Sequence, residues 1–192
     1  KRLGANVNQA MQGGFTALML AARKGQVEVV RVLGERLGAN VNQAMQGGGT
    51  ALILAAQCGH LQVVRVLGEK LGANVNQAMQ GGFTALMLAA EKGHVEVVRL
   101  LGEKLGATVN QAKQNGGTAL MLAAQNGHVE VVHLLGEKLG ANVNQASQDG
   151  DTALMLAAQD GHVEVVRLLG EKLGANVNQA NQDGGTALML AA

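Results

Sequence analysis

The sequence predicts an all-α solenoid, in which helix-turn-helix units stack in a row and β-hairpin-like fingers join them. One pattern recurs every 34 residues, and its threonine stands at Thr16, Thr50, Thr84, Thr118, Thr152 and Thr186. Each copy holds two short apolar stretches of helical period, each followed by glycine. Self-similarity at such a period is typical of stacked repeats, which grow by adding units. We therefore interpret residues 1–192 as a single array with a partial repeat at each end.

Composition restricts the core and the compartment. The chain is 47% hydrophobic but has no Trp, Tyr or Pro and only two Phe, so Ala, Val, Leu and Met must fill the core. Such uniform copies indicate recent duplication or a designed, consensus-like array. The single cysteine, Cys58, excludes an intrachain disulfide and fits a reducing compartment such as the cytoplasm if the chain is natural. For an engineered chain the sequence indicates no location.

Charge and hydropathy argue against two classes of partner. No run of about 18 apolar residues exists, so we expect no membrane span, and the N-terminal residues do not resemble a signal peptide. Net charge is +1. Residues 1–96 carry nine Lys/Arg and five Asp/Glu, whereas residues 97–192 carry six and nine. This mild asymmetry does not favour nucleic-acid binding.

The third copy illustrates the finger and the first helix. Residues 79–83 are glycine-rich and predict a turn. Thr84 predicts a helix N-cap, which typically contributes about 1 kcal/mol. The first helix is expected over residues 85–92 and ends at Gly93.

The second helix is expected over residues 95–105, with Gly106 as its stop. Its apolar stripe consists of Val97, Val98, Leu101 and Leu105. Its charged residues, which predict a solvated outer face, are Glu96, Arg99 and Glu103. The following segment, GATVNQA, has no helical period and predicts a loop that leads into the next finger.

These segments resemble the ankyrin repeat over the whole chain. TALMLAA, GHVEVVRLL and GANVN correspond to the family's TPLHLAA, GH-EVV-LLL and GADVN. Tetratricopeptide repeats share the period, but they use bulky aromatic and proline positions that this chain lacks. The resemblance implies protein binding through a concave surface, without catalysis or a cofactor.

The chain departs from the family pattern at four points. The period is 34 rather than 33, and we expect the extra residue to extend the second helix slightly. Ala replaces the proline after the capping threonine. The family histidine of TPLH becomes apolar, which predicts apolar packing, at Met19, Ile53, Met87, Met121, Met155 and Met189. Glycines inside helix two indicate either a close backbone approach or inheritance from one duplicated unit: Gly34, Gly68, Gly102, Gly136 and Gly170.

Comparison of the copies with each other locates the candidate binding surface. Most positions are the same in every copy, whereas the finger and the end of helix one vary. In ankyrin proteins these positions contact partner proteins; neutral drift is the alternative. The candidate residues are Met11, Phe15, Arg23, Lys24, Met45, Gln57, Cys58, Met79, Phe83, Glu91, Lys92, Lys113, Asn115, Gln125, Asn126, Ser147, Asp149, Asp151, Gln159, Asp160, Asn181 and Asp183.

The sequence offers no chemistry for catalysis or for a metal. His60, His94, His128 and His162 lie in different units, too far apart to share a zinc ion, and in the family this histidine braces the turn between the helices. His133 replaces an arginine of helix two and is expected to be solvated. No GxxxxGK[ST] motif follows the glycines of the fingers. Ser147 and Cys58 lack a base with an orienting third group.

The ends of the array complete the interpretation. Residues 1–3 match the tail of a second helix, and Leu188, Met189 and Leu190 are expected to expose an apolar face. Another copy could cover that face by head-to-tail stacking. The predicted function is that of a protein-interaction module. A scaffold without a specific ligand, made for stability or stacking, is the alternative.

Overall fold

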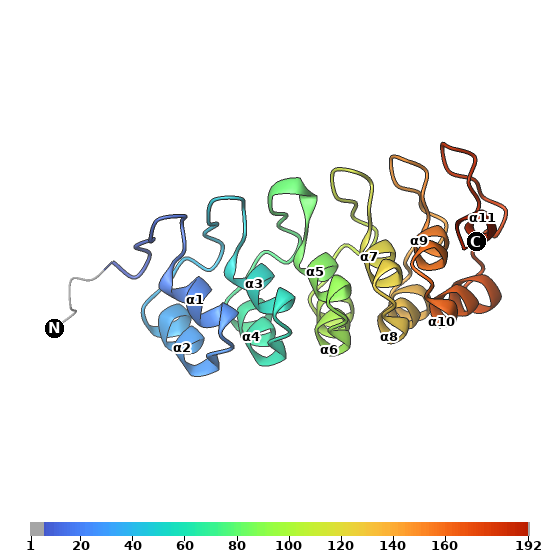
Figure 1. The fold of residues 1–192 in the computed structure, drawn as a ribbon. Coiled ribbons are helices and arrows are strands. Elements are labelled where there is room, and N and C mark those ends of the chain that lie inside the picture. Colours follow the sequence, from blue (N-terminus) through green and yellow to red (C-terminus); the bar gives the residue numbers. More distant parts are fainter. Residues whose placement is uncertain (1–5, 192) are drawn as a thin grey trace.

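The structure, a computed structural model, describes residues 6–191 as stacked helix pairs, and this confirms the predicted all-α solenoid (Figure 1). Helix one of successive repeats is α1 (Ala17–Arg23), α3 (Ala51–Gln57), α5 (Ala85–Glu91), α7 (Ala119–Gln125), α9 (Ala153–Gln159) and α11 (Ala187–Leu190). Helix two begins as α2 (Val27–Arg31), α4 (Leu61–Arg65), α6 (Val95–Arg99), α8 (Val129–His133) and α10 (Val163–Arg167). It continues as η1 (Val32–Arg36), η2 (Val66–Lys70), η4 (Leu100–Lys104), η5 (Leu134–Lys138) and η6 (Leu168–Lys172).

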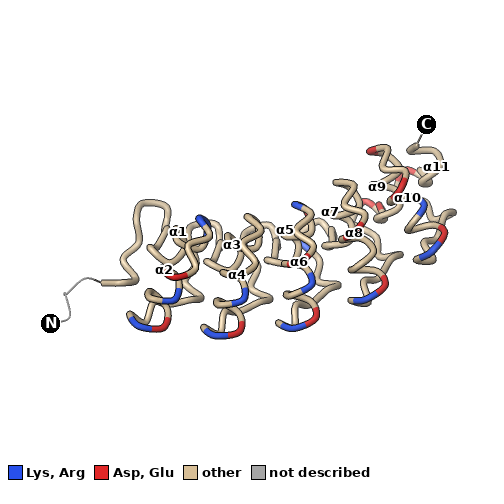
Figure 2. The backbone as a smooth tube through the Cα atoms, turned by 90° about the horizontal axis from the view of Figure 1, so that it is seen from below, with Lys and Arg blue, Asp and Glu red and all other residues tan. Residues whose placement is uncertain are grey.

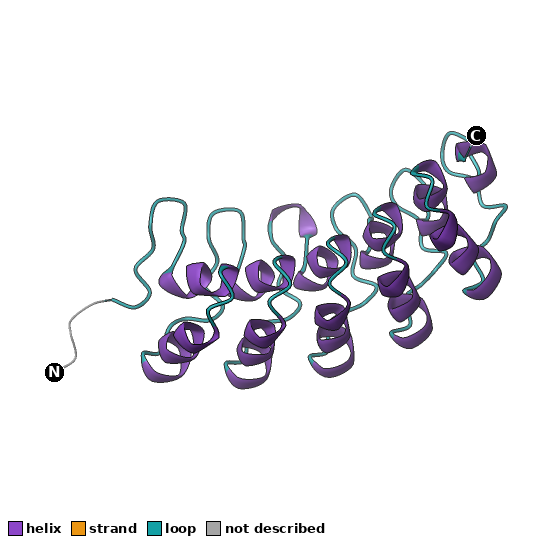
Figure 3. Ribbon diagram, turned by 60° about the horizontal axis from the view of Figure 1, so that its bottom comes forward, coloured by secondary structure: helices purple, strands orange, loops and turns teal. Residues whose placement is uncertain are grey.

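The two helices of each repeat form two parallel rows, and the fingers project from the edge near helix one (Figure 1). The stack curves, with the fingers on the inner side of the curve in the view of Figure 3. The third finger contains a single 3-10 turn, η3 (Gln80–Gly82). Within residues 6–191 the fingers form no sheet, and one isolated bridge joins Ala180 and Thr186. The fingers are therefore hairpin-like in path only.

The start and the end of helix one follow from local sequence. The Thr84 hydroxyl accepts a hydrogen bond from the Met87 backbone N–H at 3.3 Å, and Thr84 is buried. Thr16, Thr50, Thr118 and Thr152 cap their helices in the same way. Gly93, with φ of +72°, ends the helix as predicted, because a left-handed residue cannot continue it. The predicted N-caps and glycine stops are confirmed in the first five copies, whereas the Thr186 side chain makes no capping bond.

Helix two of the third repeat spans Val95–Lys104, close to the predicted residues 95–105, but its last turn is not α-helical. It is α-helical only as far as Arg99, and the next turn is a π-helix. The Leu105 N–H donates to the Leu100 carbonyl, five residues earlier, at 3.1 Å. A π turn holds more residues than an α turn. The predicted extent of helix two is therefore correct to within one residue, and a wider last turn accommodates the longer repeat.

The glycine inside each π turn allows the next repeat to approach closely. A Cβ atom on Gly68 would lie 2.4 Å from Leu105 Cδ1, where Leu105 caps the following helix two. The same leucine contact occurs at Gly34, Gly102 and Gly136, at 2.4 to 2.6 Å. At Gly170 the nearest atom would be Val177 Cγ1, 3.8 Å away. The close contact at four of these glycines is therefore with a leucine side chain rather than with backbone, and inheritance from one duplicated unit stays an alternative.

The core is continuous along the stack and consists of small and aliphatic side chains. Ala89, Ala90, Val98 and Leu101 are fully buried in the third repeat, and equivalent residues are buried in its neighbours. Met87, in place of the family histidine, is 1% exposed. Apolar packing thus replaces a polar side chain at this position, as predicted.

Asparagine side chains connect the loops of successive repeats. The Asn76 Oδ1 accepts a hydrogen bond from the Thr108 N–H at 2.8 Å, and its Nδ2 donates to the Gly106 carbonyl at 3.2 Å. Asn42, Asn110 and Asn144 make the equivalent pair of bonds. The second asparagine of the loop motif therefore satisfies backbone groups of the following repeat, a function that the sequence did not reveal.

The C-terminal end of the array exposes part of the predicted apolar face. Leu188 and Met189 are 81% and 66% exposed, as expected. Leu190 is half-buried and packs against the core, so it does not belong to the exposed face. The expected helical tail at residues 1–3 lies outside the described residues.

The role of the helix-two glycine can be tested with two matched substitutions. Gly68→Ala should lower the free energy of unfolding by about 1–3 kcal/mol, because the new methyl group overlaps Leu105. Gly170→Ala meets no close atom and should raise it by up to about 1 kcal/mol through helix propensity. Urea unfolding of both variants measures the difference. Equal effects at the two sites would contradict the close-approach interpretation.

Candidate functional site

All the fingers close with the same two backbone hydrogen bonds. In the third finger the Met79 N–H donates to the Phe83 carbonyl, and the Gly82 N–H donates to the Met79 carbonyl, both at 2.9 Å. Neighbouring fingers are also bonded to each other: the Gln80 N–H donates to the Gly47 carbonyl at 2.7 Å. The fingers therefore stand in fixed register, and equivalent side chains form rows along the array.

The fourth finger position is glycine in every copy because neighbouring backbones meet there. A Cβ atom on Gly82 would lie 2.8 Å from Lys113 Cα, and its φ is +87°. The third position varies and is exposed at Asn115 and Asp149, where the Asn115 Oδ1 accepts a hydrogen bond from the Gly117 N–H at 3.1 Å. Close backbone contact thus explains the constant glycine at the fourth position.

We call the candidate residues of the fingers and of the ends of helix one the finger surface. Its exposed members are Met11, Arg23, Lys24, Gln57, Cys58, Lys92, Asn115, Gln125, Asn126, Asp149, Gln159, Asp160 and Asp183. Its half-buried members are Phe15, Met45, Met79, Phe83, Glu91, Lys113, Ser147, Asp151 and Asn181. None of the candidate residues is fully buried, so each contributes accessible area to this surface.

The first three fingers present apolar side chains beside cations. The Arg23 guanidinium lies 5.3 Å from the centre of the Phe15 ring, and the Lys113 ammonium lies 5.0 Å from the centre of the Phe83 ring. At these distances a cation is attracted to the ring face. Met11 is 64% exposed. This part of the surface combines aromatic rings, thioethers and positive charge, as protein interfaces often do.

In the last two fingers, polar side chains form hydrogen bonds that stabilise the finger backbone. The Ser147 Oγ accepts hydrogen bonds from the backbone N–H groups of Asp149 and Asp151 at 3.2 and 3.1 Å. The Asn181 Oδ1 accepts from the Gly185 N–H, and its Nδ2 donates to Asp151 Oδ1, both at 2.8 Å. Of the candidate acidic residues, Asp149, Asp160 and Asp183 remain exposed. Ser147, Asp151 and Asn181 have a structural role that the sequence analysis did not identify.

Charge is separated along the finger surface but balanced on helix two. Up to Asn126 the finger surface carries Arg23, Lys24, Lys92 and Lys113 against Glu91 alone. From Ser147 onward it carries only acidic charge, at Asp149, Asp151, Asp160 and Asp183. On helix two, opposite charges pair within each repeat, as in Arg99 with Glu96 and Glu103 at 3.5 and 3.4 Å. Figure 2 shows mixed colours along the helix-two row and a change from blue to red along the opposite edge.

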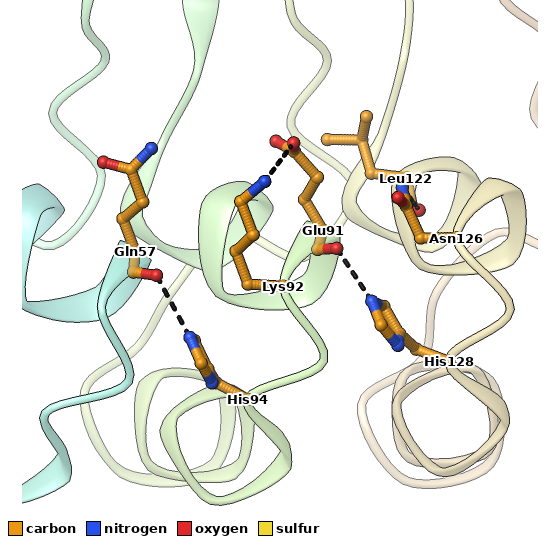
Figure 4. Close-up of polar contacts among 7 residues, drawn as sticks. All are labelled: Gln57, Glu91, Lys92, His94, Leu122, Asn126 and His128. Carbon is orange, nitrogen blue, oxygen red and sulfur yellow. Dashed lines mark hydrogen bonds and ion pairs between the residues drawn. The ribbon is translucent and has the colours of Figure 1, made fainter.

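The repeated histidines connect helix one of one repeat to helix two of the next. The His94 Nε2 is 3.0 Å from the Gln57 carbonyl oxygen, and the His128 Nε2 is 2.8 Å from that of Glu91 (Figure 4). His60 and His162 make the same contact. The histidine therefore bridges two repeats, whereas the family resemblance implied a brace within one inter-helix turn. The carbonyl groups of Arg23, Gln57, Glu91 and Gln125, at the ends of helix one, thus each contact a histidine of the next repeat.

Other candidate chemical groups are accounted for individually. His133 is exposed, and its Nε2 lies 3.1 Å from Glu137 Oε2 on the same helix. Cys58 is an exposed free thiol. Residues 6–191 contain no group of three or more His, Cys, Asp or Glu placed to hold a metal ion. In the same range no helix is both long and apolar enough to cross a membrane.

Comparison with protein families gives one match that covers nearly the whole chain. A family model described as ankyrin repeats (3 copies) matches residues 2–79, 71–147 and 138–192. A search of curated protein sequences found no match.

The structural role of Ser147 predicts a local effect of its removal. Ser147→Ala leaves two backbone amides without their acceptor, which should cost about 1 kcal/mol locally. Amide hydrogen exchange at Asp149 and Asp151 should accelerate, while the fully buried helices exchange as before. Ser147→Thr keeps the hydroxyl and serves as the control. Unchanged exchange in the alanine variant would show that the hydroxyl does not hold the finger.

Proposed function

Because the chain belongs to the ankyrin repeat family, whose repeats are generally protein-interaction modules, we propose that it binds a protein partner through the finger surface. The observation that supports this most is the contrast between its two exposed faces. Side chains vary between copies on the finger surface and recur on the outer face of helix two.

The contrast matters because substitutions at exposed sites are usually cheap, so drift alone would alter both faces. The outer positions Glu96, Arg99 and Glu103 recur in every copy, with Gln62 and His133 as the exceptions. On the finger surface no two copies are the same across both the finger and the helix end. Variation confined to one face favours a surface that has been fitted to a target.

The charge separation indicates what kind of target fits. The basic and apolar part, from Met11 to Lys113, favours an acidic segment with exposed apolar side chains. The acidic part, from Asp149 to Asp183, favours a basic segment. Repeats packed about 10 Å apart give the surface a length of several tens of ångströms, which suits a folded protein or a long peptide. Complementary charge of this kind orients the partner and accelerates association.

A charge-reversal experiment tests the surface. One variant carries Arg23→Glu and Lys24→Glu, and another carries Asp149→Lys and Asp160→Lys. Proteins captured by the unchanged chain are identified and titrated against each variant. We expect affinity to fall about tenfold or more, equivalent to about 1.4 kcal/mol, and to depend on salt concentration.

The matched control makes the same reversals on the outer face of helix two, at Arg31, Arg36, Glu130 and Glu137. The proposal expects capture to survive these changes. If the control variants lose capture while the finger variants keep it, the partner binds the outer face of helix two, which contradicts the proposal. A chain that captures nothing, with or without the changes, would favour the scaffold without a ligand.

A further inference from the structure

The methionines of the chain divide into two groups that differ in exposure. Those buried in helix one are each at most 2% exposed: Met19, Met87, Met121 and Met155. Met45 and Met79 stand at the first position of the second and third fingers and are half-buried. Both of these fingers have a neighbour on either side, so their exposure is a property of the interior of the array (Figure 1). A small oxidant in solution therefore reaches the finger methionines more readily than those of the core.

The side chain of a finger methionine lies at the edge of the core. A Cβ atom on Gly49 would lie 3.2 Å from Met45 Cε and 3.4 Å from Met45 Sδ. The Met45 thioether thus covers the fifth position of its own finger, where Gly49 has no side chain. Met45 and Met79 also pack against the core residues. Each side chain therefore lies at the boundary between the core and solvent.

The finger does not depend on the sulfur atom for its conformation. The bonds that close the third finger use the backbone N–H and carbonyl of Met79. Lys113 and Ser147 occupy the same position in the next two fingers, which close with equivalent bonds. A polar group is therefore compatible with this position. At Met87, which is 1% exposed, a polar oxygen would lie in an apolar core, which is costly unless a hydrogen-bond donor meets it.

We propose that Met45 and Met79 form an oxidation site on the finger surface, with a hydroperoxide such as hydrogen peroxide as the oxidant. A lone pair of the sulfur attacks one peroxide oxygen, so that an S–O bond forms and the O–O bond breaks. The proton of the transferred oxygen passes to the leaving oxygen, which departs as water. The thioether loses two electrons and becomes a sulfoxide, and the peroxide gains them. Methionine sulfoxide reductases reverse the modification.

Oxidation alters one part of the finger surface, and its effect on binding rests on the proposed function. A sulfoxide is polar, whereas the thioether is a flexible apolar group. Met45 and Met79 belong to the basic and apolar part of the surface, and no finger after the third carries a methionine. Oxidation therefore weakens contacts with apolar side chains of a partner and leaves the acidic part unchanged.

The experiment measures the oxidation of individual methionines in the full chain. This chain carries Met11→Leu, Met189→Leu and Cys58→Ser, so that only interior methionines and no thiol consume the oxidant. Hydrogen peroxide is added, and peptide mapping by mass spectrometry follows the gain of one oxygen at each methionine. We expect Met45 and Met79 to react about tenfold faster than the helix-one methionines, because susceptibility follows exposure. The helical circular dichroism signal should persist until both are fully oxidised.

A matched control removes the two sulfur atoms and keeps apolar side chains. It adds Met45→Leu and Met79→Leu to the same background. A partner captured by the background chain is titrated against both chains before and after peroxide. The affinity of the background chain should fall about tenfold on oxidation and recover after treatment with a methionine sulfoxide reductase. The affinity of the leucine chain, whatever its starting value, should be the same before and after peroxide.

Three results would overturn the proposal. The first is oxidation of Met45 and Met79 at the rate of the helix-one methionines. The second is loss of the helical signal in step with oxidation of the fingers, which would give these methionines a structural role. The third is unchanged affinity for the partner after both have been oxidised. Failure of the untreated chain to capture a partner counts against the proposed function alone, since the oxidation rates are measured without a partner.

Discussion

The contact between a glycine in one helix two and the leucine that ends the next recurs at all four junctions between successive helix pairs. A methyl group added at Gly68 would require the Leu105 side chain to move. Both residues belong to the π turns, since Gly68 lies inside η2 and Leu105 directly follows η4. At this spacing the histidine reaches the preceding helix end, the asparagine reaches the next loop, and finger bonds to finger. Since these contacts join only neighbouring repeats, stability is approximately a sum over junctions.

Close stacking also decides what remains available to a partner. Two hydrogen bonds close each finger, a third joins it to its neighbour, and histidines bond to carbonyls at the ends of helix one. The side chains at the variable positions are the part of this surface that differs between copies. Most of those side chains form no hydrogen bond between repeats, although Asn181 bonds to Asp151 and Lys113 lies over the Phe83 ring, so most can change without disturbing the stack. The separation of positive and negative charge along one face is compatible with an otherwise uniform stack for this reason.

Local rules were sufficient to predict the helix boundaries but not the contacts between repeats. Thr84 and Gly93 act through their own backbone neighbourhood, so the sequence indicated both ends of helix one. The π turn was missed because a single wider turn hardly alters an apolar stripe. The leucine partner of Gly68 lies 37 positions along the chain and was identifiable only from the stacked structure. Ser147 and Asn181 did carry a signal, since such residues favour turns in which they bond backbone two residues on.

The central claim is that constant residues stack the repeats, whereas the variable residues of the finger surface bind the partner. It is tested most directly by a chain in which the finger and helix-one-end residues of every copy are replaced by those of the third copy. We expect cooperative urea unfolding with a midpoint close to that of the unchanged chain, together with loss of binding to the partner captured by the original. The claim would be contradicted if the substituted chain still bound the partner at the original affinity, or if it no longer folded.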